Sequence, residues 1–124
     1  MNHLNMGLIA LSLLPGILIL ISGIYLKFNA SAYPNTGMGY KTELTVKNEQ
    51  TWKEGNSFAG NVFILVGICN MILWPVAGYI FLNMTSLIVM SYLFFVLLST
   101  IFMITPIENH LNRIFDRSGN HRTA

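Results

Sequence analysis

The sequence predicts an all-α protein, an integral membrane bundle of three helices. Of its 124 residues, 53% are hydrophobic and 10% are charged, whereas an average soluble domain carries about 25% charged residues. The charged residues gather in two blocks, at residues 27–54 and 108–122. A helix needs about 20 mainly apolar residues to cross the roughly 30 Å hydrocarbon core of a bilayer. Three uncharged stretches are long enough.

The three predicted spans belong to one membrane domain that covers residues 1–124, and they lie at residues 7–26, 58–82 and 86–105. A signal peptide is the alternative for the first span. However, no Lys or Arg precedes it, and its apolar run is longer than the 7–15 residues typical of such peptides. Pro15 and Pro75 are expected to bend the first two helices and Pro106 to end the third. The short link between the last two spans predicts a helical hairpin.

The distribution of basic residues predicts the orientation of the chain. All seven Lys and Arg lie in residues 27–57 or in residues 106–124, and an odd number of spans places both segments on one side. Lys and Arg are enriched in cytoplasmic segments. We therefore expect the N-terminus outside and the C-terminus inside, with a cytoplasmic loop at 27–57 and a cytoplasmic tail at 106–124.

Small residues recur along one stripe of each of the first two spans. The second span carries Gly60, Gly67 and Gly78. The first span carries Ser12, Gly16 and Gly23. Helices in lipid associate where small side chains allow close backbone approach. We therefore interpret these stripes as a helix contact rather than as a pore.

The sequence offers no recognisable catalytic constellation. His3, His110 and His121 have no nearby Cys and no partner at helical spacing, so neither a metal site nor a cofactor is expected. The spans hold no Asp, Glu, Lys, Arg or His, which argues against ion-coupled transport. Acidic residues are interleaved with the lysines of the first block, so nucleic acid is not an expected partner. We do not expect an enzyme.

Four polar side chains inside the spans form a further candidate set: Asn61, Asn70, Tyr92 and Ser99. Such groups usually form a hydrogen bond with a neighbouring helix. A role in ligand binding is the alternative for Asn70, because it lies near the middle of its span.

The first loop contains the most specific pattern in the chain. Its Pro-Asn turn and two glycines predict a compact segment, because glycine permits positive φ and close backbone approach. Thr45 can cap the following helix, and the run from Thr51 to Glu54 fits a capping box that would place Trp52 at headgroup depth. The alternative is an ordinary loop whose lysines contact anionic lipid.

These loop residues have the order P-N-x3-G-Y-[RK]-T followed by W-x3-N, which resembles the signature of the SdpI family of bacterial membrane proteins. The matching positions are Pro34, Asn35, Gly39, Tyr40, Lys41, Thr42, Trp52 and Asn56. One position departs from the commoner form, since Lys41 stands where Arg is more frequent, and Lys lacks the bidentate fork of Arg. The run from Glu108 to Asn120 is also similar to the tails of short members.

The resemblance implies a role in immunity at the bacterial cytoplasmic membrane. The family's namesake protects a producing cell from its own secreted toxic protein and holds a transcriptional repressor at the membrane. The expected partners are therefore the lipid bilayer, a secreted toxin, a cytoplasmic repressor and a second copy of the chain. Two alternatives stay open: an accessory subunit of a larger membrane complex, and half of a dimeric transporter.

Overall fold

The computed structural model describes residues 3–29, 33, 38–81 and 84–123. It contains four α-helices: α1 (His3–Ser12), α2 (Leu14–Phe28), α3 (Glu49–Ile80) and α4 (Thr85–Ile114). Three helical segments are long and apolar enough to cross a membrane: Met6–Phe28, Glu49–Ile80 and Ser86–Ile114. In the described part of the chain, the one extended pairing is an isolated bridge between Phe115 and His121. The predicted all-helical fold with three spanning helices is confirmed.

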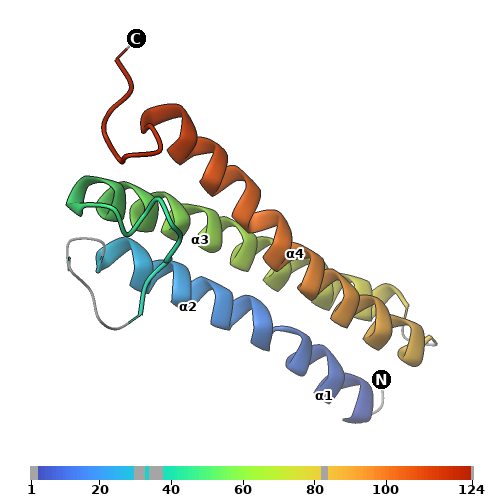
Figure 1. Ribbon diagram of the computed structural model, residues 1–124. Coiled ribbons are helices and arrows are strands. Elements are labelled where there is room, and N and C mark those ends of the chain that lie inside the picture. Colours follow the sequence, from blue (N-terminus) through green and yellow to red (C-terminus); the bar gives the residue numbers. More distant parts are fainter. Residues whose placement is uncertain (1–2, 30–32, 34–37, 82–83, 124) are drawn as a thin grey trace.

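The helices form three neighbouring rods, with α1 and α2 together making the first (Figure 1). Helix α3 packs against α2 and, less extensively, against α1 and α4. The N-terminus lies at the end where α3 finishes and α4 begins, which we call the hairpin end. The connection from α2 to α3 and the C-terminal segment lie at the opposite end, which we call the loop end. The loop and the tail are therefore neighbours, as three spans require.

The first rod is interrupted at Leu13. Pro15 lacks a backbone N–H, and its ring disfavours regular helix at the carbonyl four residues earlier. The chain responds with a tighter turn, in which the Leu13 N–H donates to the Ala10 carbonyl at 3.2 Å, before α2 resumes with Pro15 in its first turn. The predicted bend is thus a break between α1 and α2.

The other two intramembrane prolines lie inside continuous helices. Pro75 is within α3 and Pro106 is within α4. The expectation that Pro106 ends the third helix is wrong, because α4 continues to Ile114. Ile107 and Leu111, just beyond the proline, are fully buried. The burial of these two side chains stabilises the continued helix by more than the lost hydrogen bond at Pro106 destabilises it.

The predicted glycine contact between the first two spans is confirmed. A Cβ atom on Gly67 would lie 2.7 Å from the Leu20 nitrogen and 2.9 Å from the Gly16 carbonyl oxygen. Gly23 and Gly60 approach each other in the same way, about two helical turns closer to the loop end. The backbones of α2 and α3 therefore touch directly, which only small residues permit.

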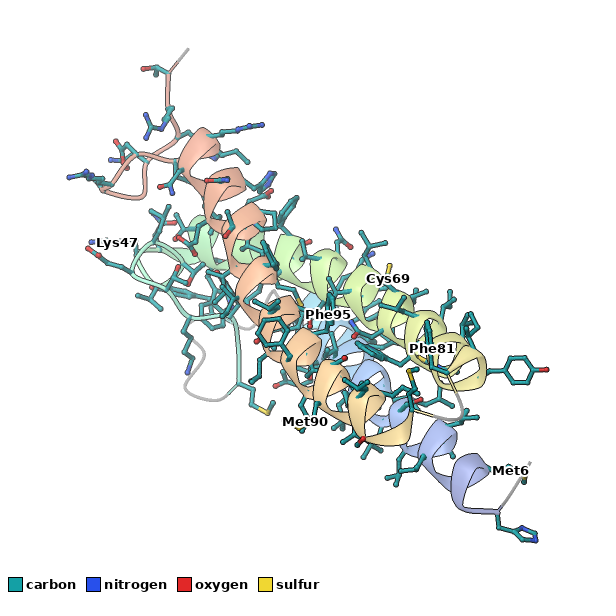
Figure 2. The ribbon with its side chains drawn as sticks, turned by 90° about the vertical axis from the view of Figure 1, so that its right-hand side faces the viewer. Met6, Lys47, Cys69, Phe81, Met90 and Phe95 are labelled. Carbon is teal, nitrogen blue, oxygen red and sulfur yellow. The ribbon has the colours of Figure 1, made fainter. Side chains whose placement is uncertain are left out.

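Buried apolar side chains gather at the loop end. They come from every long helix, from the loop and from the tail: Leu26, Leu44, Ala59, Ile107, Leu111 and Phe115. Along the remaining length of the rods, large apolar side chains such as Met90 face outward, as does Cys69 (Figure 2). The molecule thus combines a protein-like core at one end with an apolar outer surface suited to lipid.

Helix α3 begins earlier than its predicted span. Asn48 is the N-cap: its side-chain oxygen accepts from the Thr51 N–H at 2.9 Å, and the Thr51 hydroxyl accepts from the Asn48 N–H at 3.1 Å. The capping box expected from Thr51 to Glu54 is therefore wrong, since Thr51 is the third helical residue rather than the cap. Residues 49–57 belong to α3, and the true loop is shorter than residues 27–57.

Candidate functional site

Three motif residues, Gly39, Tyr40 and Trp52, converge on the buried side-chain amide of Asn56 at the loop end. The Asn56 side-chain oxygen accepts from the Tyr40 N–H at 2.7 Å, and its NH2 donates to the Trp52 carbonyl at 3.0 Å. Asn56 is 2% exposed. Because it satisfies backbone groups of both the loop and α3, it fixes the loop on the helix. We call Gly39, Tyr40, Thr42, Trp52 and Asn56 the motif cluster.

Gly39 lies directly on the ring of Trp52. A Cβ atom on Gly39 would stand 2.7 Å from Trp52 Cζ2 and 3.2 Å from the Asn56 side-chain oxygen. Among the described residues, positive φ occurs only at Gly119, so Gly39 is required for close approach rather than for an unusual backbone angle. The space beside the indole ring admits a hydrogen atom and nothing larger.

Trp52 is a core residue of this cluster. It is 2% exposed, and the Tyr33 ring packs at a centroid distance of 6.1 Å. The predicted headgroup depth of Trp52 stays a prediction, and within the protein the loop covers its ring. Its indole N–H is buried and has no hydrogen-bond partner within the described ranges. A buried donor without an acceptor is unusual and costs about 1–3 kcal/mol.

Two buried threonines close the segment between the motif and α3. The Thr45 hydroxyl accepts from the Thr42 N–H at 2.7 Å and lies 3.1 Å from the Tyr40 carbonyl oxygen, to which it can donate. Thr51 lies behind it, with its hydroxyl 3.3 Å from the Thr45 carbonyl. Both threonines are fully buried. Thr45 therefore closes a turn instead of capping a helix.

Tyr40 also connects the loop to α4. Its hydroxyl donates to Glu108 Oε1 at 2.9 Å. Burial raises the pKa of the Tyr40 hydroxyl well above its ordinary value, and the hydrogen bond to Glu108 and the charge of that carboxylate raise it further. Tyr40 therefore stays protonated and remains a hydrogen-bond donor.

A second polar contact joins α3 to α4 at the same end. His110 Nε2 lies 2.7 Å from Glu54 Oε1, and the imidazole ring stacks on Phe58 at a centroid distance of 3.8 Å and an angle of 4°. The sequence shows no partner for His110 at helical spacing, and the fold provides one 56 positions away on α3. In the described ranges, no group of three His, Cys, Asp or Glu side chains is placed to hold a metal ion.

The C-terminal segment folds back onto the loop. Asp116 accepts from the Ser118 and Asn120 N–H groups at 2.8 and 2.9 Å, which forms a tight turn with Gly119 at φ 85°. The Asn48 side chain donates to the Gly119 carbonyl at 2.8 Å. Phe115 is 1% exposed. The predicted tail is thus an ordered wall of the site.

The motif cluster as defined above leaves out three motif residues predicted for the site: Lys41, Pro34 and Asn35. Lys41 directly follows Tyr40 in the loop and is exposed. Pro34 and Asn35 lie outside the described residues. Glu108, His110, Asn48 and Thr45 complete the site, although no local pattern assigned them to it.

The four polar residues inside the spans do not form a common site. Asn70 is buried, and it bonds within its own helix: its NH2 donates to the Val66 carbonyl at 2.8 Å and its oxygen accepts from Trp74 Nε1 at 3.1 Å. Ser99 also bonds within its helix, and Asn61 is exposed. Only Tyr92 of these four makes a hydrogen bond between helices in the described structure, a long one of 3.4 Å to the Ser12 carbonyl.

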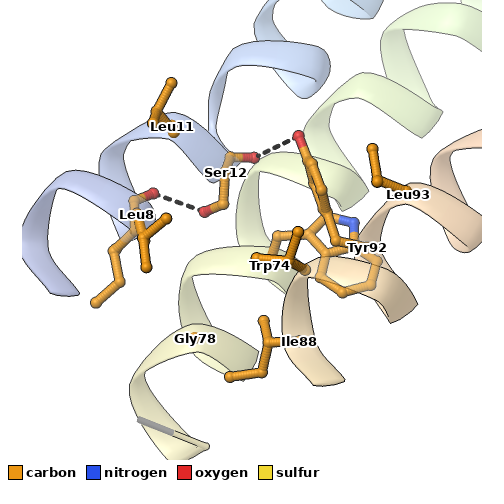
Figure 3. Close-up of a pocket in the computed structure, with 10 residues that line it drawn as sticks. Leu8, Leu11, Ser12, Trp74, Gly78, Ile88, Tyr92 and Leu93 are labelled. Carbon is orange, nitrogen blue, oxygen red and sulfur yellow. Dashed lines mark hydrogen bonds between the residues drawn. The ribbon is translucent and has the colours of Figure 1, made fainter. Parts of the chain in front are cut away.

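An apolar cavity of about 230 Å³ lies near the hairpin end between α1, α3 and α4 (Figure 3). Trp74 and Tyr92 form one wall, with their rings edge to face at 4.9 Å, and Leu8 and Ser12 face them from α1. Among the described residues that line it, there is no Asp, Glu, Lys, Arg or His. The cavity therefore suits an apolar group.

These features define a small all-helical protein. It has three helices long and apolar enough to span a membrane, and its loop and tail pack against the helices at one end. The chain belongs to the SdpI/YfhL protein family, whose sequence model matches residues 31–107. The match covers the first loop, all of α3 and most of α4, and it confirms the resemblance predicted from the motif. No curated protein and no solved structure matches the chain.

Proposed function

We propose that this protein is an SdpI-type immunity protein of the bacterial cytoplasmic membrane, which protects its host from a secreted toxic peptide or protein. One observation carries the proposal: the described family-motif residues other than Lys41 form a single packed unit, in which Gly39, Trp52 and Asn56 fix the loop onto α3. Such a unit is built to hold a binding surface. Membership of the SdpI/YfhL family supports the same assignment.

The proposed orientation places the loop end in the cytoplasm and the hairpin end outside, because all seven Lys and Arg then lie inside. A toxin arriving from outside would meet the hairpin end, where the cavity beside Trp74 and Tyr92 can take an apolar side chain. A cytoplasmic repressor would meet the loop end. Signalling would then need α4 to connect the two ends.

Helix α4 has contacts suited to that role. Near the hairpin end it presents Tyr92 to the cavity, and at the loop end it contacts the motif through Glu108 and contacts α3 through His110. A toxin that moves α4 relative to α3 would strain both loop-end contacts. Such coupling requires two arrangements of α4 relative to α3, and the toxin and the repressor must bind these two arrangements with different affinities.

The test is survival of a sensitive bacterium that produces each variant and is challenged with the cognate toxin, where a neighbouring gene encodes one. We expect Gly39→Val and Asn56→Ala to abolish protection while the protein still reaches the membrane. Glu43→Ala is the matched control, because Glu43 lies in the same loop with a side chain that is 94% exposed. Full protection by a membrane-inserted Gly39→Val variant would overturn the proposal.

The two alternatives predict other results in the same strain. An accessory subunit would copurify with a partner whether or not toxin is present, and would be unstable when produced alone. Half of a dimeric transporter would give substrate flux in proteoliposomes. Either result, together with no difference in survival between cells with and without the protein, would replace the immunity proposal.

A further inference from the structure

An open hollow of about 570 Å³ lies at the loop end, between the last turn of α2, the first turns of α3 and the tail. Its α2 wall carries Lys27, and its α3 wall carries Gln50, Lys53 and Ser57. The three α3 residues are spaced three and four positions apart, so they share one face of the helix. Four side chains that can donate hydrogen bonds therefore surround one space, and two of them are cations from different helices.

Two cations, Lys27 and Lys53, and one acid line the hollow. Lys27 makes no hydrogen bond or ion pair with any described residue. Lys53 lies 2.7 Å from Glu49, but both side chains are at least half exposed, so that pair is weak and open to competition. The first turn of α3 adds the positive end of its dipole.

One acidic group, Glu54, also lines the hollow. Its carboxylate lies 2.7 Å from His110, on the α4 side. The tail contributes His121, which adds a further donor. The acid therefore has a partner on α4, and Lys27, Lys53, Gln50 and Ser57 remain as donors that line the hollow.

The position of the hollow relative to the spans indicates what it binds. The first apolar span ends at Phe28, which follows Lys27 and is 76% exposed. The hollow thus opens where α2 leaves the apolar region, with outward-facing apolar side chains directly beside it. Basic pockets at this depth between membrane helices suit the phosphate of a lipid headgroup.

We propose that this hollow is a binding site for the phosphodiester of an anionic phospholipid. Lys27 and Lys53 contact the phosphate from two sides, Gln50 and Ser57 donate hydrogen bonds, and the acyl chains run along the exposed face of α2 beside Phe28. The occupied site joins α2 to α3 at the loop end. The site is separate from the motif cluster, so the proposal does not depend on the immunity function.

The test measures lipid-dependent thermal stabilisation of the purified full chain in detergent, with dioleoyl phosphatidylglycerol and dioleoyl phosphatidylcholine as probes. We expect phosphatidylglycerol to stabilise the wild type and phosphatidylcholine to have little effect. The Lys27→Gln, Lys53→Gln double variant should bind phosphatidylglycerol about tenfold or more weakly. Its stability without lipid should remain close to that of the wild type, because both side chains reach solvent.

The matched control is Lys47→Gln, which removes one positive charge from the same end but outside the hollow. It should retain the wild-type preference for phosphatidylglycerol. Equal losses for Lys47→Gln and for each single substitution, Lys27→Gln and Lys53→Gln, would indicate a diffuse surface effect and overturn the proposal. Stabilisation by inorganic phosphate as strong as that by phosphatidylglycerol would overturn the lipid assignment.

Discussion

The Tyr40 hydroxyl donates a 2.9 Å hydrogen bond to Glu108, a residue of α4 that lies 68 positions further along the chain. The Tyr40 backbone is held by Asn56 of α3. One loop residue thus contacts two membrane helices, through its main chain on one and its side chain on the other. This arrangement makes the loop a spacer that sets the distance between α3 and α4 at the loop end.

The raised pKa of Tyr40 predicts a loss of stability in alkaline solution. The unfolded chain releases the tyrosine proton near pH 10, whereas the folded chain holds it to a higher pH. The stabilising contribution is therefore complete below about pH 10 and is lost as the pH rises above that value. At neutral pH, Tyr40→Phe should lower the free energy of unfolding by about 1 kcal/mol through loss of the hydrogen bond to Glu108.

The measurement is unfolding in detergent from about pH 8 to about pH 11. The wild type should lose stability more steeply above pH 10 than Tyr40→Phe does. Tyr79→Phe is the control, because Tyr79 is 67% exposed on α3, and it should follow the wild type. Equal alkaline slopes for the wild type and Tyr40→Phe would show that the raised pKa does not contribute.

The packing of α2 against α3 predicts strong sensitivity at Gly67. Replacing Gly67 with Leu forces side-chain atoms against the Leu20 and Gly16 backbone, and it should cost about 1–3 kcal/mol or more. Cys69→Leu should be nearly neutral, because Cys69 is exposed on the same helix. Thermal unfolding in detergent compares the two variants, and equal effects at both positions would contradict the direct contact of the two backbones.

The sequence was sufficient for this helix contact because the signal is local. Gly60 and Gly67 lie on one stripe of their helix, seven positions apart, and Gly16 and Gly23 repeat this spacing on the other helix. Helical periodicity alone places each pair on one face. The spans themselves follow in the same way from the length of the uncharged stretches.

The contacts across the site could not be predicted in this way. Glu108 and His110 have unremarkable sequence surroundings, and their partners Tyr40 and Glu54 lie on other elements. Which polar residues meet depends on how α4 crosses α3. It also depends on the continuation of α4 beyond Pro106. The start of α3 was open to prediction, since Asn48 is as good an N-cap as Thr51 and precedes it by the three positions that a capping box needs.

The docked tail predicts a local change in protease sensitivity. Gly119 has a φ of 85°, and a Cβ atom there would lie 2.9 Å from both Asn48 Nδ2 and Lys47 Cβ. Gly119→Val should therefore release the turn, at a cost of about 1–3 kcal/mol. Trypsin should then cleave after the exposed Arg117 about tenfold faster for each 1.4 kcal/mol of lost docking energy.

Ser118→Ala is the control for the tail, because the turn uses the backbone N–H of Ser118 and its side chain is exposed. It should be cleaved at the wild-type rate. If Gly119→Val and the wild type were cleaved equally fast while Ser118→Ala was also unchanged, the tail would not depend on this turn for its position.

The orientation of the chain can be tested by cysteine labelling in a Cys69→Ser background, which removes the single native thiol. Glu43 and Ser118 mark the loop end and Met84 marks the hairpin end, and all three residues are exposed. With the loop end in the cytoplasm, a membrane-impermeant maleimide should label Met84→Cys in intact spheroplasts. It should label Glu43→Cys and Ser118→Cys only after lysis.

Labelling of Glu43→Cys and Ser118→Cys in intact spheroplasts, with Met84→Cys protected, would invert the orientation. Labelling of Glu43→Cys and Ser118→Cys from opposite sides would contradict three spans, because the fold holds the loop and the tail together through Asn48 and Gly119.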